Sequence, residues 1–240
     1  MFTIPEYLPF WPEDEKPAFL TRSNTVYGRT SLKALESRGL ENRLLSNIAE
    51  HLPSGVFIAG GFMASVMQET LEKSKDIDFF FRDPKALHDM IELIKNPPEE
   101  AWSLKGYTLA TDEEFIKHKS QTLRFIEFKH EKERPTLQLI KLSWFDSPEA
   151  VIDSFDLTVS QFATDGKDLI YNPISMIDLA RKRLVLHRMQ FPASTMRRIV
   201  KYSKKGYYCC PGSLTTIAEE IVKIATSDPS VLGGKFVYLD

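Results

Sequence analysis

The sequence has few cysteines, almost no net charge and no long apolar run, and each shortage excludes a class of protein. Two cysteines, the neighbours Cys209 and Cys210, occur among 240 residues. Adjacent cysteines have neither the spacing of a zinc site nor the geometry of an unstrained disulfide. The formal net charge is −2, so any attraction to nucleic acid must come from a local basic surface.

The chain also lacks the signals of membrane insertion and export. No apolar run approaches the ~18 residues of a membrane-spanning helix, so we expect no membrane partner. The N-terminal stretch MFTIPEYLPFWPEDEKPAF has no basic start followed by an apolar core, and therefore does not resemble a signal peptide. Unpaired cysteines suit a reducing compartment. These features favour a cytoplasmic globular protein.

The pattern of apolar residues predicts an α+β fold with two parts. Helical spacing predicts helices over 31–52 (broken near Gly39), 62–74, 84–96 and 147–154. Alternating or continuous apolar runs predict strands over 55–61, 76–81, 122–130, 135–144, 155–164 and 168–172, of which the last four form two hairpins. Prolines among residues 1–25 indicate an extended arm. The pattern becomes helical from residue 173, so we expect domains over 1–172 and 173–240.

A Gly-Gly pair, Gly60 and Gly61, ends the first predicted strand and leads directly into a helix. Backbone N–H groups that converge on such a turn can approach a phosphate closely, and the start of a helix favours negative charge. Ser65, one turn further on, adds a hydroxyl. The turn is therefore a candidate phosphate cradle, although a lone Gly-Gly pair after a strand is more often only a turn.

Two acids, Asp76 and Asp78, lie in the apolar run DIDFFF. Residues two apart on a strand project from the same face. Carboxylates so close repel each other unless a cation lies between them, and Mg²⁺ prefers oxygen ligands of this kind. A phosphate cradle facing a metal pair is what nucleotidyl transfer requires.

The stretch FIAGGFMASVMQETLEKSKDIDFFF resembles the signature of the DNA polymerase beta superfamily of nucleotidyltransferases, in the style of CCA-adding enzymes and bacterial poly(A) polymerases. The resemblance implies a nucleotidyltransferase-type mixed sheet flanked by helices, an NTP substrate such as ATP and two Mg²⁺ ions. It implies that Gly60 and Gly61 hold the triphosphate and that Asp76 and Asp78 bind metal. Where CCA-adding enzymes carry an Arg-Asp pair after the glycines, this chain has Phe62 and Met63.

The same family adds a third acid from a neighbouring strand, as a metal ligand or a general base. Gln138 lies at the centre of one candidate strand but cannot be ionised. Asp156 lies among apolar residues in SFDLTVSQF and is the preferred candidate for catalysis and metal binding. Asp153 is the fallback.

The segment 178–210 is strongly basic and interleaved with tyrosines. It resembles the neck that follows the head in the same enzymes, and such a surface can contact an RNA or a triphosphate. We take Arg197 and Lys201 as candidate nucleotide-binding residues. A solvated pair of amphipathic helices is an equally good interpretation.

Three functional hypotheses follow. The first is a Mg²⁺-dependent enzyme that moves an NMP from an NTP to a hydroxyl, preferably of RNA such as a tRNA end, with a protein or small-molecule acceptor left open. The second is a catalytically degenerate relative that binds nucleotide or RNA. The third, a purely structural partner protein, leaves the paired acids unexplained.

Overall fold

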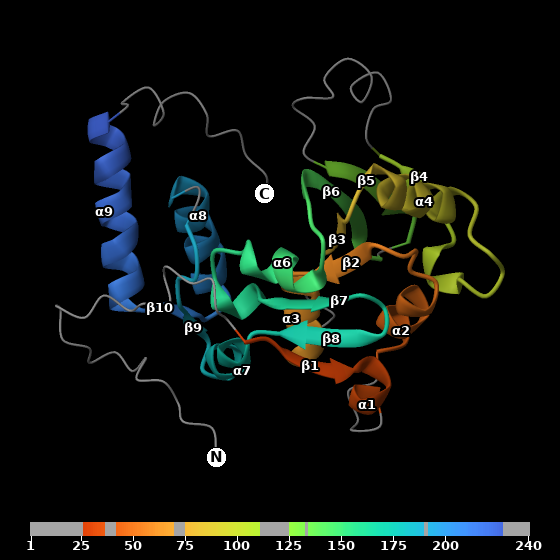
Figure 1. The fold of residues 1–240 in the computed structure, drawn as a ribbon, viewed down its shortest axis with the longest axis horizontal. Coiled ribbons are helices and arrows are strands. Elements are labelled where there is room, and N and C mark those ends of the chain that lie inside the picture. Colours follow the sequence, from red (N-terminus) through yellow and green to blue (C-terminus); the bar gives the residue numbers. More distant parts are fainter. Residues whose placement is uncertain are drawn as a thin grey trace. The chain divides into compact units, whose positions relative to one another are not determined.

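The computed structural model describes residues 26–36, 42–69, 75–110, 125–132, 134–189 and 192–227, and they form the expected α+β fold (Figure 1). The described strands of the main sheet are β1 (Gly28–Ser31), β2 (Val56–Ala59), β3 (Asp76–Phe81), β4 (Tyr107–Leu109), β5 (Phe125–His130), β6 (Thr136–Trp144), β7 (Phe162–Thr164) and β8 (Asp168–Tyr171). The helices are α1 (Leu32–Glu36), α2 (Arg43–Glu50), α3 (Gly61–Met67), α4 (Pro84–Lys95), α6 (Pro148–Asp153), α7 (Pro173–Ala180), α8 (Pro192–Ser203) and α9 (Pro211–Ser227).

The main sheet is mixed, and its strands run in the order β1-β8-β7-β2-β3-β6-β5-β4. β3 and β6 are parallel, whereas every other neighbouring pair is antiparallel. All four residues of β2 are buried, as are all three of β7. Side chains on the two faces of a strand alternate, so both faces of this central part of the sheet are covered.

Side-chain caps set the starts of three helices that border the sheet. Asn42, Asp83 and Ser147 each accept a hydrogen bond from the backbone N–H three residues ahead, at the starts of α2, α4 and α6. Pro84 and Pro148 follow two of these caps at the first helical position. Such a residue satisfies one of the N–H groups that a helix start leaves without a partner, and proline needs none.

Most predicted elements are confirmed, including the β5–β6 hairpin and the β7–β8 pair. The strand predicted over 155–164 is wrong in its first half. Only Phe162–Thr164 is a strand there, and Thr158–Ser160 forms a 3-10 helix (η4). The predicted arm over 1–25 lies outside the described residues. The edge strands β1 and β4 were not predicted, since they are short.

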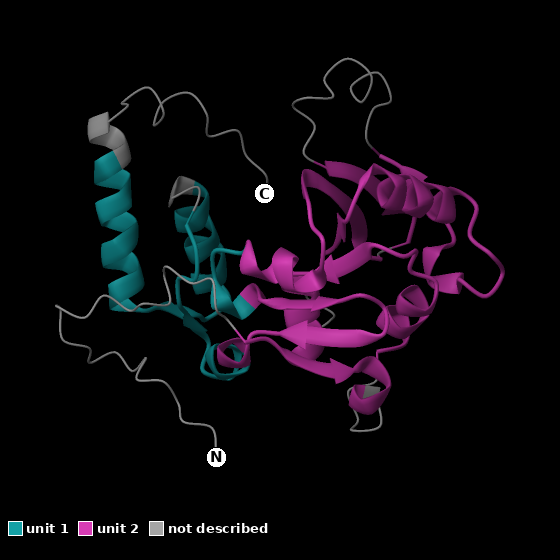
Figure 2. Cartoon of the chain, in the orientation of Figure 1, with its two compact units in different colours: residues 1–25, 155–159, 176–240 teal, residues 26–154, 160–175 magenta. Residues whose placement is uncertain are grey.

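The chain divides into two compact units (Figure 2). One unit, magenta and labelled unit 2 in Figure 2, contains residues 26–154 and 160–175, and with them the main sheet. The other, teal and labelled unit 1 in Figure 2, contains residues 1–25, 155–159 and 176–240 and is called the second unit below. The second unit therefore takes residues 1–25 and 155–159 from the predicted first domain, and it contains the predicted helical region except for residues 173–175. It also holds a parallel ribbon of β9 (Arg183–Leu184) and β10 (Tyr208–Cys209), where the sequence predicted only helices. In the described part of the chain, no helix has both the length and the apolarity to cross a bilayer.

A buried ion pair ties the segment 155–159 to α7 within the second unit. Asp178 is fully buried, and Arg183 donates to one of its carboxylate oxygens from Nε at 2.8 Å and from a terminal nitrogen at 2.5 Å. The Thr158 hydroxyl donates to the other oxygen at 2.6 Å. Burial raises the pKa of Asp178, and the bonds from Thr158 and Arg183 work in the opposite direction. Arg183 is thus a structural residue, although the sequence placed it in the basic segment.

We expect Asp178→Asn to lower the free energy of unfolding by about 3 kcal/mol, because it leaves the Arg183 charge buried without a counter-charge. Urea denaturation followed by circular dichroism measures this change. The control is Asp168→Asn, which breaks the exposed Arg29 pair and is expected to cost less than about 1 kcal/mol. Equal effects of the two substitutions would contradict a special role for the buried pair.

Candidate functional site

The Gly-Gly turn joins β2 to α3, and its first glycine has a backbone conformation that other residues avoid. Gly60 has φ 86° and ψ −141°, a region that only glycine enters without strain. Its N–H donates to the carbonyl of Phe162 at 3.0 Å, and its carbonyl accepts from Ala64 at 3.0 Å. The Gly60 N–H therefore belongs to the sheet. The N–H groups that helix geometry leaves without an intrahelical partner are the ones that follow it, at the start of α3.

Strand pairing brings the acids of β3 to this turn. In the antiparallel β2–β3 pair, Ala59 lies opposite Asp78. The glycine turn begins at the next residue, so it lies at the end of the sheet where β3 starts. The strand register thus brings the glycine turn and the two acids to the same end of the sheet.

Asp76 and Asp78 project from one face of β3, whereas Ile77, Phe79 and Phe81 project from the other. Both acids are half-buried, whereas Ile77 and Phe79 have 0% exposure. The alternation confirms that the two carboxylates share a face, and it explains how two acids can occupy a strand of the core. Their apolar neighbours supply the packing on the opposite face.

The same face continues across β6 and β5 as a row of polar side chains. Gln138 lies opposite Asp78 in the parallel β3–β6 pair, and Glu127 lies opposite Gln138 in the antiparallel β5–β6 pair. The Gln138 amide donates to a Glu127 carboxylate oxygen at 3.0 Å. All three residues are half-buried, and Leu137 and Phe128 fill the opposite face. Glu127 was not predicted, although it carries the same signal as Asp76 and Asp78: an acid between buried apolar residues of a strand.

The donors on this face suit a hard divalent cation. Two carboxylates two residues apart can share an ion, and an amide oxygen is a further hard donor on the adjacent strand. Within the described residues, no group of three or more His, Cys, Asp or Glu side chains is arranged to hold a metal ion. A magnesium site here would therefore draw on Asp76 and Asp78, with remaining ligands from water or a phosphate substrate.

Ser65 and Asp156 have local partners in the structure. The Ser65 hydroxyl donates to the Gly61 carbonyl at 2.9 Å, inside α3. Asp156 belongs to the second unit, where its carboxylate accepts from Arg198 at 2.5 Å and from the Thr195 hydroxyl at 2.9 Å. The role of Asp156 as third carboxylate stays a prediction.

Arg197 and Lys201, the other predicted nucleotide-binding residues, lie on α8 of the second unit. Lys201 is exposed and Arg197 is half-buried. Their proposed contact with nucleotide likewise stays a prediction.

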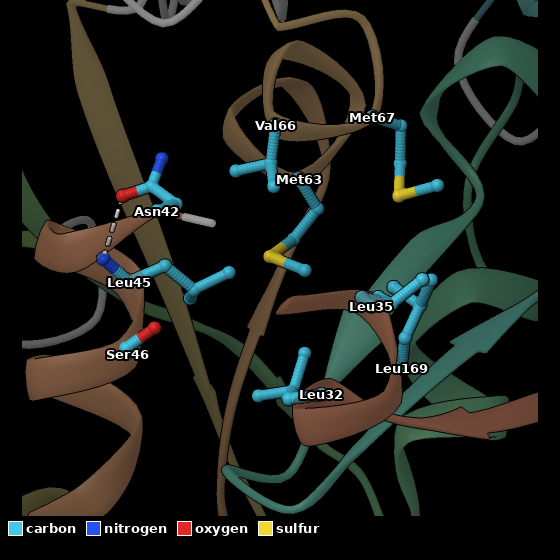
Figure 3. Close-up of a pocket in the computed structure, with 9 residues that line it drawn as sticks. All are labelled: Leu32, Leu35, Asn42, Leu45, Ser46, Met63, Val66, Met67 and Leu169. Carbon is cyan, nitrogen blue, oxygen red and sulfur yellow. Dashed lines mark hydrogen bonds between the residues drawn. The ribbon is translucent and has the colours of Figure 1, made fainter. Parts of the chain in front are cut away.

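A small pocket lies beside α3, and none of the predicted site residues lines it (Figure 3). Met63, Val66 and Met67 of α3 line it together with leucines from α1, α2 and β8, and Asn42 and Ser46 add polar atoms. So apolar a lining provides few polar groups that could bind a triphosphate. The candidate site is therefore the polar face of β3, β6 and β5 with the glycine turn.

Comparison with known sequences identifies a family. A family model described as "Gabija anti-defense 2 family protein" matches residues 33–182, a range that includes the glycine turn and the polar face. A curated relative, "Gabija anti-defense 2" of Bacillus phage SPbetaL7, is 25% identical over 175 residues, which make up 70% of this chain and 38% of that protein. The chain thus spans less than half the length of this relative.

Comparison with solved structures identifies the fold. A CCA-adding enzyme in complex with ATP superposes with a TM-score of 0.56 at 12% identity, covering 83% of this chain and 48% of that one. The Thermotoga maritima CCA-adding enzyme in complex with tRNA gives a TM-score of 0.53 at 13% identity, covering 81% and 46%. The nucleotidyltransferase fold expected from the sequence is confirmed. Here too the chain spans about half of the matched proteins.

We expect Gly60→Ala to lower the free energy of unfolding by roughly 1–3 kcal/mol, because alanine is strained at this backbone conformation, and to abolish binding of Mg²⁺-ATP. Thermal denaturation and isothermal titration calorimetry measure the two effects. Gly55→Ala is the matched control, since Gly55 has φ 82° at the opposite end of β2. It should lose similar stability and keep the binding. Loss of binding in both variants would show that strain alone accounts for the effect.

Proposed function

Because the chain belongs to the Gabija anti-defense 2 family and has a nucleotidyltransferase fold, we propose that it is a Mg²⁺-dependent nucleotidyltransferase. It moves an NMP from an NTP to a hydroxyl acceptor. The observation that supports this most is the pairing of Ala59 with Asp78, which brings the glycine turn to two carboxylates on one face of β3. Neither the glycine turn alone nor the pair of carboxylates alone would be specific for a nucleotidyltransferase.

In this proposal each part of the site has a separate task. The backbone at the start of α3 binds the triphosphate, and the carboxylates of Asp76 and Asp78 hold Mg²⁺. Mg²⁺ held there would neutralise phosphate charge and lower the pKa of the attacking hydroxyl, whose proton would pass to water. The acceptor oxygen then bonds to the α-phosphorus as the bond to the bridging oxygen breaks, and pyrophosphate leaves. The carboxylates of Asp76 and Asp78 also orient the acceptor hydroxyl toward the α-phosphorus.

A third acidic group has two candidates. Asp156 was predicted from the sequence, but its carboxylate already accepts bonds from Arg198 and Thr195. Glu127 lies on the same sheet face as Asp78, one strand beyond Gln138. We prefer Glu127, acting through Gln138, as the group that completes the polar face. Asp156 is then an anchor for α8.

The acceptor is proposed to be RNA, because a CCA-adding enzyme of this fold has been solved with tRNA and segment 178–210 is basic. The family description adds a biological setting, since it names an activity directed against the Gabija defence. A protein hydroxyl of that defence is the competing acceptor. Labelling of RNA and of protein in the same reaction separates the two.

One observation favours the second hypothesis, a nucleotide-binding protein without catalysis. Gln138, directly opposite Asp78, is neutral, and the family resemblance implies an acid from a neighbouring strand. A site with two carboxylates can retain Mg²⁺-NTP without activating an acceptor. Tight Mg²⁺-dependent binding of NTP without any transfer would identify this case.

We expect Asp76→Asn and Asp78→Asn each to reduce transfer of label from α-³²P-labelled NTPs by roughly 10²–10³-fold, because each removes a charge that holds Mg²⁺. The assay contains Mg²⁺, RNA and host protein extract, and gel electrophoresis identifies the labelled acceptor. Asp89→Asn is the control, since Asp89 is a carboxylate of α4 that pairs with Lys85 on the surface. Undiminished transfer in both site variants would refute the proposed function.

We expect Glu127→Gln to lower transfer by roughly 10-fold, the effect typical of a residue that orients its neighbours in a metal site, without changing thermal stability. Asp156→Asn should instead lower the melting temperature of the protein, because it weakens the contacts with Arg198 and Thr195.

Gln138→Glu, which places an acid beside Asp78, should tighten binding of Mn²⁺, measured by electron paramagnetic resonance. If Asp156→Asn alone abolished transfer at unchanged stability, Asp156 would be the third carboxylate.

A further inference from the structure

We propose that a group of exposed cations around Lys182, together with one exposed tyrosine, binds the backbone and bases of a single-stranded polynucleotide. The group, the Lys182 cluster, consists of Arg181, Lys182, Lys204, Lys205 and Tyr208. The inference rests on the proposed function, since it names the surface of the second unit that an acceptor strand would contact.

Backbone pairing brings the two halves of the Lys182 cluster together. Lys182 follows α7, and its carbonyl accepts from the N–H of Tyr208 at 2.9 Å. In the β9–β10 ribbon, Arg183 lies opposite Tyr208. A Cβ built on Gly206 would lie 4.0 Å from the Lys182 ammonium nitrogen. The ammonium therefore lies at the turn that directly follows Lys204 and Lys205.

Lys182 has a backbone conformation that costs free energy for a lysine. Its φ is 52°, in the left-handed region, and its N–H donates to the carbonyl of Leu179 at 3.1 Å as α7 ends. Glycine is the usual residue at such a helix end, because a side chain there is strained. Backbone strain of this kind is found at functional sites, where the side chain of the strained residue takes part in the function. For Lys182, the function indicated is binding of a negatively charged ligand by the ammonium group.

The sequence around the cluster has few acids. No Asp or Glu occurs from residue 179 to residue 218. Among the described residues of the second unit, Asp178 pairs with Arg183 and Asp156 pairs with Arg198. Like charges held side by side repel one another, and a bound polyanion removes that repulsion. The cluster therefore combines backbone strain and charge repulsion at one place.

An exposed ring beside the cations favours a single strand over other polyanions. Tyr208 is 55% exposed. Tyr202 and Tyr207 pack edge to face with ring centroids 5.2 Å apart, and the Lys205 ammonium lies 5.5 Å from the centre of the Tyr202 ring. Single-stranded nucleic acid presents phosphates and open base faces together, so it can use both the cations and the Tyr208 ring. An acidic protein surface offers only the charges.

Lys182→Gly is the decisive variant, because strain and charge have opposite effects on two measurements. It should raise the melting temperature, since glycine suits the left-handed conformation, and weaken binding by about 3–10-fold. Binding is measured by fluorescence anisotropy with the full chain and a labelled RNA of about 16 nucleotides. The slope of log K against log salt should fall by about 0.7, the value for one phosphate contact of a single strand. Tyr208→Ser should weaken binding without changing that slope.

Two controls separate strain from charge. Glu69→Gly relieves the same strain in the other unit, where Glu69 has φ 54°, and should raise the melting temperature without weakening binding. Lys105→Gln removes an exposed cation outside the cluster and should leave the affinity unchanged. Weakening by Lys105→Gln equal to that by Lys182→Gly would overturn the proposal, as would unchanged binding and salt slope in Lys182→Gly.

The ligand class and the proposed function are tested by separate arms. Single-stranded RNA and single-stranded DNA of equal length are compared directly, and the tighter ligand identifies the source of the strand. A polyglutamate peptide of equal charge that competed as well as either would overturn the assignment to nucleic acid. Asp76→Asn should bind the strand normally. If the unsubstituted chain transfers no nucleotide while Lys182-dependent binding is intact, the proposed function alone is refuted. Transfer to RNA with Lys182-independent binding refutes this inference alone.

Discussion

The antiparallel pairing of β2 with β3 is the constraint on which the candidate site depends. It sets Ala59 opposite Asp78, so the glycine turn after β2 and the acids of β3 occupy one end of the sheet. A shift of the register by one residue would turn both carboxylates into the opposite, apolar face. The burial of Ile77 and Phe79 opposes such a shift, because those side chains would then leave the core. The packing of the apolar face thus fixes the orientation of the two carboxylates on the opposite face.

The polar face extends beyond the two acids of β3. Gln138 and Glu127 extend it across the neighbouring strands through a hydrogen bond of 3.0 Å. The amide is neutral, so the charge beside Asp78 is lower than a third carboxylate on β6 would make it. Under the proposed function, such a site would take more of its metal ligands from the substrate phosphates than from the protein. Metal binding and nucleotide binding would then be interdependent.

The second unit is organised by a different interaction. Asp178 receives hydrogen bonds from Arg183 and Thr158 in a fully buried setting, and these bonds join α7 to the segment 155–159. The basic residues of this region consequently fall into two groups. Arg183 and Arg198 are paired with acids. The Lys182 cluster is exposed and lies within residues 179–218, a stretch of sequence without Asp or Glu. Net charge alone, at −2 for the whole chain, would have hidden this separation.

The sequence by itself determined the fold class, most elements and the central motif, because these depend on local periodicity and on turn residues. Gly60 and Gly61, with Asp76 and Asp78 after them, could be interpreted from a short stretch of chain. The edge strands β1 and β4 and the β9–β10 ribbon could not be predicted, since so few residues carry no periodic signal. Only the tertiary structure decided that Glu127 shares a face with Asp78, that Asp156 binds Arg198, and that the Lys182 ammonium lies near Gly206. Each of these arrangements involves residues distant in sequence, and register and packing, rather than local preference, bring them together.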